Sequence, residues 1–147
     1  MYHDILVATD GSALSGKAVE TGAKFAKAFG AKLHVLHVRP PADKVIYSEG
    51  AATIYVSNDQ VRKQLEEEEW QLLAAAGEIA KASGVSAETE YVLNASPYEG
   101  ILRVAKERAC DLIVMASHGR RGISAMLLGS ETQKVLTHSS IPVFVIR

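Results

Sequence analysis

Short runs of apolar, β-favouring residues alternate along this chain with longer segments of helical periodicity. The run Ile5–Thr9 is apolar almost throughout, as expected of a strand buried on both faces of a sheet. Residues 13–29 then place their apolar side chains on one helical stripe, and Gly30 follows where a left-handed glycine commonly ends a helix. A buried strand followed at once by an amphipathic helix is the repeating unit of a parallel sheet.

The same alternation continues to the end of the chain. Further strands are predicted at Lys32–Val38, Ser86–Val92, Asp111–Ala116 and Pro142–Ile146. Further helices are predicted from Asn58 or Asp59 to about Ser83, from Ser96 to near Ala109, and from about Ser130 to His138. This order predicts one α/β domain over residues 1–147: a Rossmann-like three-layer sandwich with a five-stranded parallel sheet between helices.

Three local features complete this prediction. The segment 39–57 is expected to be a polar loop, because Pro40 and Pro41 stand near its start, but the runs VIY and TIYV leave the conformation of its middle undecided. Ser96-Pro97-Tyr98-Glu99 predicts a capping box with proline at the first helical position. Glu66–Glu69 is expected to form the solvated side of the long helix.

The composition excludes several classes of partner and compartment. The net charge of -1 over 147 residues provides no basic field for nucleic acid or anionic lipid. No run approaches the ~20 apolar residues of a membrane span, and the N-terminus lacks a basic region typical of a signal peptide. Cys110 is the single cysteine, which suits a reducing compartment, and we expect it to be a small buried residue. A cytoplasmic protein without nucleic-acid or membrane partners is therefore expected.

The carboxyl edge of the predicted sheet is where a ligand is expected. In open α/β sheets, ligands bind beyond the carboxyl ends of the strands, where the strand order reverses. The residues just after the strands are Asp10-Gly11-Ser12, Val38-Arg39 and the segment from Ser117 onward. These segments are therefore the candidates for a binding site.

A glycine-containing segment follows the fourth predicted strand. Gly119 allows backbone N–H groups to approach an anion closely, and Gly129-Ser130 stands where the next helix begins and favours phosphate. Arg120 and Arg121 add positive charge. The alternative is a tight strand-to-helix connection with Ser130 as an ordinary N-cap. The glycines alone favour neither interpretation.

The spacing of these glycines resembles that of the ATP-binding branch of the universal stress protein family. Gly119, nine residues, and then Gly129-Ser130 match the second and third parts of the family's motif. The opening ILVATDGS, a strand ending in HV, the strand CDLIVM and the closing IPVFVIR are also similar to family members. One position departs, because the family's first motif glycine is Ala116 here.

The resemblance implies an adenine nucleotide alpha hydrolase-like fold and an ATP site, possibly with Mg²⁺. Asp10 would lie near the base, ribose or metal-bound phosphate, unless it is only a turn or N-cap residue. Val38 would offer backbone groups to adenine, and Met115 and Ala116 would line the ribose. His118 is more readily interpreted as solvent-facing or loop-bracing than as catalytic. The full set of implied cofactor-binding residues is Ala8, Thr9, Asp10, Gly11, Ser12, Val38, Met115, Ala116, Ser117, His118, Gly119, Arg120, Gly129, Ser130, Glu131 and Thr132.

Three functions remain open at this point. The first is an ATP-binding stress-response sensor or regulator. The second is a slow ATPase or self-phosphorylating protein with Asp10 and Glu131 as candidate groups, although the chain has neither GxxxxGK[ST] nor SGGxDS, so no catalytic residue is assigned. The third is a nucleotide-free family member acting through protein contacts, which Ala116 favours. Relatives also imply a homodimer through the strand 142–146, and no Cys/His cluster predicts a metal site.

Overall fold

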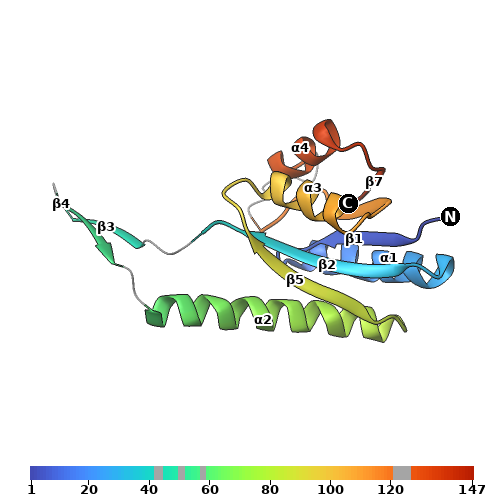
Figure 1. Cartoon of the computed structure of the whole chain (residues 1–147), viewed down its shortest axis with the longest axis horizontal. Coiled ribbons are helices and arrows are strands. Elements are labelled where there is room, and N and C mark those ends of the chain that lie inside the picture. Colours follow the sequence, from blue (N-terminus) through green and yellow to red (C-terminus); the bar gives the residue numbers. More distant parts are fainter. Residues whose placement is uncertain (42–44, 50–51, 57–58, 121–126) are drawn as a thin grey trace.

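A five-stranded parallel sheet forms the centre of the computed structural model, which describes residues 1–41, 45–49, 52–56, 59–120 and 127–147. Its strands are β1 (Asp4–Ala8), β2 (Lys32–Arg39), β5 (Ala87–Leu93), β6 (Leu112–Ala116) and β7 (Val143–Ile146). The helices are α1 (Ala13–Phe29), α2 (Asp59–Ala82), α3 (Pro97–Glu107) and α4 (Ser130–His138). The predicted alternation of strands and helices is confirmed for these elements (Figure 1).

Helices cover both faces of the sheet and make a three-layer α/β fold. Ile5 and Val7 of β1 pack toward α1 and α2, whereas Leu6 between them packs toward α3 and α4. This alternation explains why β1 is apolar at every position: both of its faces are buried. Cys110 is buried in the second of these cores, and burial raises the pKa of its thiol to about 12.

The spatial order of the strands is β5-β2-β1-β6-β7. From β1 the chain builds outward to β2 and β5, and then crosses back to place β6 on the other side of β1. The order therefore reverses between β1 and β6. The segments that follow Ala8 and Ala116 lie at this reversal, where the loops of a parallel sheet diverge and leave room for a ligand.

The segment predicted as a polar loop contains two further strands. β3 (Val45–Glu49) and β4 (Ala52–Val56) pair antiparallel, with Val45 opposite Val56 and Glu49 opposite Ala52. The sequence left the middle of this segment undecided, and the structure has strands over these ten positions, since valine, isoleucine, threonine and tyrosine favour extended backbone.

Glu69 contradicts the expectation that 66–69 is the solvated side of the long helix. Its residue is 5% exposed, because it shares the buried stripe of α2 with Leu73, Ala76 and Ala80. Its carboxylate is met by two side chains of β2: His37 Nδ1 lies 2.5 Å from Oε2, and Arg39 Nε lies 3.2 Å from Oε1. A buried carboxylate of this kind persists only with such partners.

The predicted capping box at the start of α3 is not formed. Pro97 is the first helical residue as expected, but the side chain of Ser96 makes no capping hydrogen bond. In a capping box Glu99 would accept from the N–H of Ser96, and here that N–H donates to Asn94 Oδ1 at 2.8 Å. The N–H of Tyr98 donates instead to Glu131 Oε2 of α4 at 2.8 Å.

No helix in the part of the chain that the structure describes is long and apolar enough to span a membrane.

Candidate functional site

A cavity of about 560 Å³ opens at the carboxyl edge of the sheet. The ends of β1, β2 and β6 form its floor, and the first turns of α3 and α4 form a wall. Its described lining consists of Ala8, Thr9, Asp10, Ser15, Leu36, His37, Val38, Pro40, Pro97, Ile101, Met115, Ala116, His118, Gly119, Arg120, Gly129, Ser130, Glu131 and Thr132.

The structure brings the sequence-predicted residues together around this one cavity. All of them line it except Gly11, Ser12 and Ser117, which lie in the loops behind it. Ser12 is the N-cap of α1 and accepts the N–H of Ser15 at 3.2 Å. The carbonyl of Ser117 accepts the N–H of Gly129 at 2.6 Å. These residues shape the loops without facing the cavity.

Asp10 links the two loops at the point where the strand order reverses. Its Oδ1 accepts the N–H of Ser12 and its Oδ2 accepts the N–H of Arg120, both at 2.9 Å. Partial burial raises the pKa of Asp10, but the hydrogen bonds from Ser12 and Arg120 outweigh burial, so its pKa lies below the ordinary value. Asp10 is therefore an ionised turn residue, and Ser12 rather than Asp10 is the cap of α1.

The two motif glycines both line the cavity, and a side chain at either position would collide with neighbouring atoms. A Cβ on Gly119 would strike the carboxylate of Asp10. A Cβ on Gly129 would lie 3.2 Å from both the carbonyl oxygen of Ser117 and the Cα of His118. Neither glycine has a positive φ, so close approach rather than backbone conformation requires glycine here.

The start of α4 gives the cavity an anion-favouring end. Gly129 is the N-cap and Ser130 the first helical residue, so the expectation of Ser130 as N-cap is wrong by one position. The N–H groups of the first turn have no acceptor inside the helix, and the dipole of α4 is positive there. We call Asp10, Gly119, Arg120, Gly129 and Ser130 the polar end of the cavity.

Three other predicted residues have partners that brace this end. Thr132 Oγ1 donates to the carbonyl of Ala116 at 2.9 Å, which ties α4 to the end of β6. Glu131 accepts from Tyr98 N through Oε2, and its Oε1 lies 3.2 Å from Lys134 Nζ. His118 Nδ1 lies 3.1 Å from Ser117 Oγ, a contact within the loop itself.

Ala116, the residue that departs from the family motif, is accommodated without backbone strain. It is the last residue of β6, paired with Ile146 of β7, and its φ is not positive. An alanine in such a conformation carries no left-handed penalty. Its methyl group narrows the cavity floor but does not distort the strand.

The lining that comes from β2 and α3 is largely apolar and contains most of the residues that sequence reasoning missed. We call Leu36, Val38, Pro40, Pro97 and Ile101 the apolar end. Val38 packs so closely on α3 that a Cβ on Gly100 would lie 2.7 Å from its Cγ1.

His37 and Ser15 are the remaining residues that the sequence analysis missed. Leu36 and His37 were within reach of sequence reasoning, since they immediately precede Val38 at the end of a predicted strand. Pro97 and Ile101 left no such signal, because an amphipathic helix does not reveal what its first turn faces.

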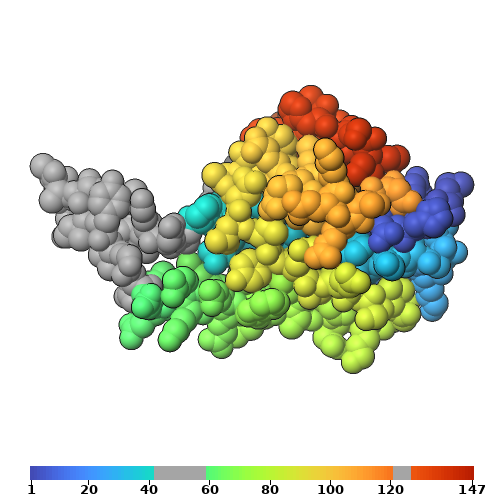
Figure 2. Space-filling model, viewed as in Figure 1, coloured from blue at the N-terminus to red at the C-terminus, as the bar shows by residue number. Residues whose placement is uncertain are grey.

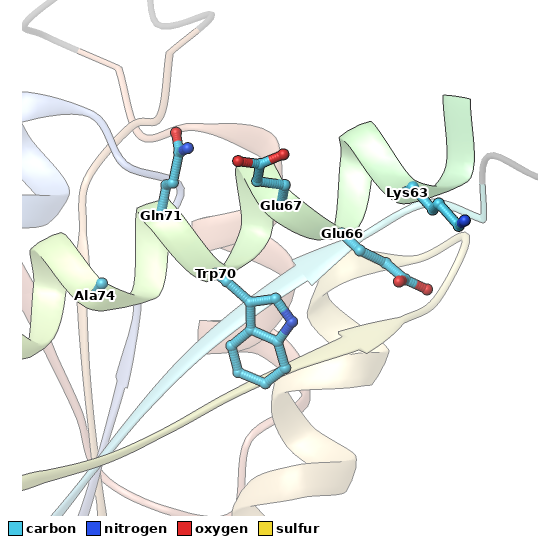
Figure 3. Close-up of a pocket in the computed structure, with 6 residues that line it drawn as sticks. All are labelled: Lys63, Glu66, Glu67, Trp70, Gln71 and Ala74. Atoms are coloured by element: carbon cyan, nitrogen blue, oxygen red, sulfur yellow. The ribbon is translucent and has the colours of Figure 1, made fainter. Parts of the chain in front are cut away.

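A second hollow on the outer face of α2 does not resemble a site. It is lined by residues of this one helix: Lys63, Glu66, Glu67, Trp70, Gln71 and Ala74. Figure 3 shows that their side chains diverge, with Trp70 on one side of the helix and Glu67 and Gln71 on the other. Side chains that diverge from one helix enclose no ligand, so the cavity at the sheet edge is the candidate site.

Comparison with known proteins identifies the family of this fold. The model of the universal stress protein family matches residues 1–147. The chain belongs to the universal stress protein family. The universal stress protein YxiE of Bacillus subtilis is 39% identical over 150 residues, with 100% of each chain covered.

Solved structures of universal stress proteins share this fold. A universal stress protein in complex with cAMP is 26% identical with a TM-score of 0.73, covering 99% of this chain and 97% of that one. The universal stress protein from Archaeoglobus fulgidus in complex with dAMP has a TM-score of 0.70 and covers 99% of this chain and 98% of that one. At 22% identity the latter likeness is one of fold alone.

Proposed function

We propose that this universal stress protein binds ATP in the sheet-edge cavity and acts as a cytoplasmic stress-response sensor or regulator. The observation that carries the proposal is that one cavity is lined by apolar residues of β2 and α3 and by polar residues of the loops after β1 and β6 and the start of α4. A nucleoside triphosphate has the same division, since a flat base is at one end of the molecule and a polyanion at the other. The apolar end would hold the base, and the polar end would hold the phosphates.

The groups at the polar end suit a triphosphate. The first turn of α4 offers backbone donors and a positive dipole end, and Arg120, which lines the cavity, adds positive charge nearby. A universal stress protein that is 26% identical and was solved in complex with cAMP supports an adenine nucleotide as the ligand.

Magnesium fits the proposal through the phosphates rather than through a protein site of its own. The described residues contain no group of three or more His, Cys, Asp or Glu side chains that could hold a metal ion. Asp10 and Glu131 nevertheless bring two carboxylates to the cavity, and carboxylates repel a bare triphosphate. A Mg²⁺ ion bound to the phosphates would offset this repulsion, with Asp10 as the nearest candidate ligand on the polar end.

A regulator fits the site better than an efficient ATPase. Fast hydrolysis needs a group that orients the attacking water. The two candidates, Asp10 and Glu131, already accept backbone N–H groups that hold the loops and helices together. Binding without rapid turnover stabilises the liganded form by linkage, which is what a sensor requires.

We further propose a homodimer through strand 142–146. β7 is at an edge of the sheet, and its Phe144 is 43% exposed. An apolar edge strand is commonly covered by pairing with another strand.

The content of the purified protein tests the nucleotide proposal. Acid release followed by chromatography should yield ATP at about one per chain, or the stripped protein should bind added ATP and release it when Mg²⁺ is chelated. ADP that accumulates with time would favour the slow ATPase. A nucleotide-free protein that does not bind added ATP would overturn the proposal and favour action through protein contacts alone.

A matched pair of variants localises the binding to the cavity. Arg120→Gln removes a positive charge from the polar end and should weaken ATP binding about tenfold, since charge-assisted contacts contribute about 1.5–3 kcal/mol. Arg103→Gln makes the same change on α3, where the guanidinium pairs with Glu107 in solvent. This control should bind ATP as the parent protein does, and equal affinities for both variants would place the phosphates elsewhere.

A further inference from the structure

The outer edge of β5 has no partner strand in the part of the chain that the structure describes. β5 is the last strand in the order of the sheet, and it pairs with β2 alone. The N–H of Asn94 donates to the carbonyl of Arg39 on β2, and the backbone groups of successive residues point alternately to the two sides of a strand. Thr89, Tyr91 and Leu93 therefore turn their N–H and carbonyl groups to the open edge.

Small residues of α2 leave space beside this edge. The second half of α2 and the start of β5 line an open hollow of about 600 Å³. Ala74 and Gly77 line it from the helix, and Thr89 lines it from the strand. Even a Cβ added to Gly77 would lie 4.0 Å from the methyl group of Thr89, so the helix does not fill this space. Side chains of a strand added to β5 would find room here.

Trp70 extends the same side of the strand with apolar surface. Its ring lies edge-on to Tyr91, with 5.5 Å between the ring centroids, and Figure 3 shows it on the side of α2 away from Glu67. Trp70 is 56% exposed, and Leu93, on the same face of β5 as Tyr91, is 49% exposed. Exposed apolar side chains that adjoin an open strand edge are typical of a surface that another chain covers.

The opposite face of β5 is acidic. Glu88 and Glu90 alternate with the residues above, so their side chains are on the face toward α3, where Val92 packs into the core. The side chain of Glu88 is 65% exposed, and its Oε2 lies 3.5 Å from Nδ1 of the buried His34. Glu90 accepts from Arg108 Nε at 3.0 Å. β5 itself has no basic residue.

Charge decides which strand fits this edge. A second copy of β5 in antiparallel pairing about Thr89 would bring glutamates opposite glutamates, and like charges in these positions destabilise a strand pair. A strand with lysine or arginine there would form pairs of opposite charge. Nowhere in this chain do two Lys or Arg residues flank a single apolar residue, so a strand of that pattern comes from another protein.

We propose that the outer edge of β5 binds an extended segment of a partner protein in which basic and apolar residues alternate. The backbone of the segment pairs with the outward groups of Thr89, Tyr91 and Leu93. Its apolar side chains cover Trp70 and the hollow beside α2, and its basic side chains meet the acidic face of β5. The segment binds at the edge opposite β7, and its binding does not depend on a nucleotide.

The fluorescence of Trp70 tests the proposal, because Trp70 is the only tryptophan of the chain. The probe is a short synthetic peptide in which lysine and valine alternate. Its titration should give a saturable blue shift of the emission, since an added strand removes the exposed indole from water. A peptide of the same composition with its lysines in one block should bind at least about tenfold more weakly, because it cannot keep its charges on one face.

Two pairs of variants, measured by calorimetric titration with the alternating peptide, locate the binding on β5. Leu93→Pro removes an outward N–H and should weaken binding at least about tenfold. Val145→Pro makes the same change on β7 and should bind as the parent protein does. Glu88→Gln should weaken binding severalfold, and more so at low salt. Glu107→Gln is its control, since Glu107 pairs with Arg103 in solvent on α3.

Each other outcome contradicts the proposal in a distinct way. The absence of a saturable shift would mean that the edge takes no such strand, and equal binding of both peptides would mean charge attraction without strand pairing. Binding that Val145→Pro abolishes and Leu93→Pro retains would place the strand at β7. Self-association of the parent protein that Leu93→Pro abolishes would assign the edge to a second copy. If Leu93→Pro does not fold, parent-like binding by both Glu88→Gln and Trp70→Ala overturns the proposal instead.

Discussion

Asp10 joins two loops that are far apart in the chain by accepting a backbone N–H from each of them. One oxygen binds Ser12 at the start of α1, and the other binds Arg120 after β6. Gly119 is glycine because this carboxylate occupies the space of a side chain. The motif glycine and the acidic residue after β1 are thus parts of one contact.

The pH dependence of stability measures the contribution of Asp10. Its folded-state pKa is lowered, so the ionised carboxylate contributes stability that is present above the unfolded-state pKa of about 4 and is lost as the pH falls through the folded value. Asp10→Asn should therefore be less stable than the parent protein near neutral pH in urea unfolding, and the difference should shrink toward about pH 3.

Asp59→Asn is the control for this titration. The side chain of Asp59 is 82% exposed and pairs with Arg62 in solvent, so its removal should change stability little at either pH. A stability loss for Asp10→Asn that is the same at both pH values would assign the effect to shape rather than to charge.

Helix α3 is capped by another helix rather than by its own sequence. Ser96 and Glu99 have the residue types of a capping box, yet Asn94 takes the N–H that Glu99 would accept. Glu131 of α4 then supplies the acceptor for Tyr98 N and places a negative charge at the positive end of the α3 dipole. This contact couples the two helices that form the wall of the cavity.

Two alanine variants separate the local cap from the tertiary cap. Glu131→Ala should cost about 1 kcal/mol of unfolding free energy in nucleotide-free protein, the usual value for loss of a helix cap. Ser96→Ala should cost close to nothing, since that hydroxyl makes no capping hydrogen bond. Chemical denaturation of both variants measures the two losses of unfolding free energy. A larger loss for Ser96→Ala than for Glu131→Ala would show that the capping box of Ser96 and Glu99 stabilises α3.

The whole molecule has two sheet edges, β5 and β7, and the proposed dimer uses one of them. The carbonyls of Pro142 and Ile146 accept the N–H groups of Ile113 and Ser117, so the backbone groups of these two residues face β6. Along a parallel strand the backbone groups of successive residues point alternately to the two sides. The N–H groups of Val143 and Val145 therefore point to the open edge.

At the other edge of the sheet, α2 covers one face of β5 (Figures 1 and 2). Trp70 of α2 lies edge-on to Tyr91 of β5. We expect the partner strand of the dimer at β7, where Phe144 is exposed.

Proline substitutions at the two edges test this assembly. Val145→Pro removes an outward N–H and should convert a dimer at micromolar concentration to monomer in sedimentation velocity, with the fold retained by circular dichroism. Leu93→Pro makes the equivalent change on β5, because the N–H of Asn94 points to Arg39 of β2 and that of Leu93 therefore points outward. The Leu93 variant should remain dimeric. A parent protein that sediments as a folded monomer would contradict the proposed dimer.

The helices and strands of the five-stranded sheet were predictable because each depends on the periodicity of neighbouring residues. The continuous apolar character of β1, the helical stripe of residues 13–29 and the spacing of Gly119 and Gly129 are properties of neighbouring residues, and the structure has the corresponding elements in that order. The β3–β4 pair lies in the part of the 39–57 segment whose conformation the sequence left undecided, because its short β-favouring runs follow two prolines.

Contacts between distant elements were decided only by the tertiary structure. Glu69 was expected in solvent with its neighbours, and it is buried because β2 places His37 and Arg39 beneath that turn of α2. Glu131 caps α3 because the fold sets α3 and α4 side by side. Periodicity tells which face of an element is buried, but the partner on that face depends on the order in which the sheet assembles its strands. The sequence by itself thus determined the elements and the glycine spacing, while the strand order determined which side chains surround the cavity.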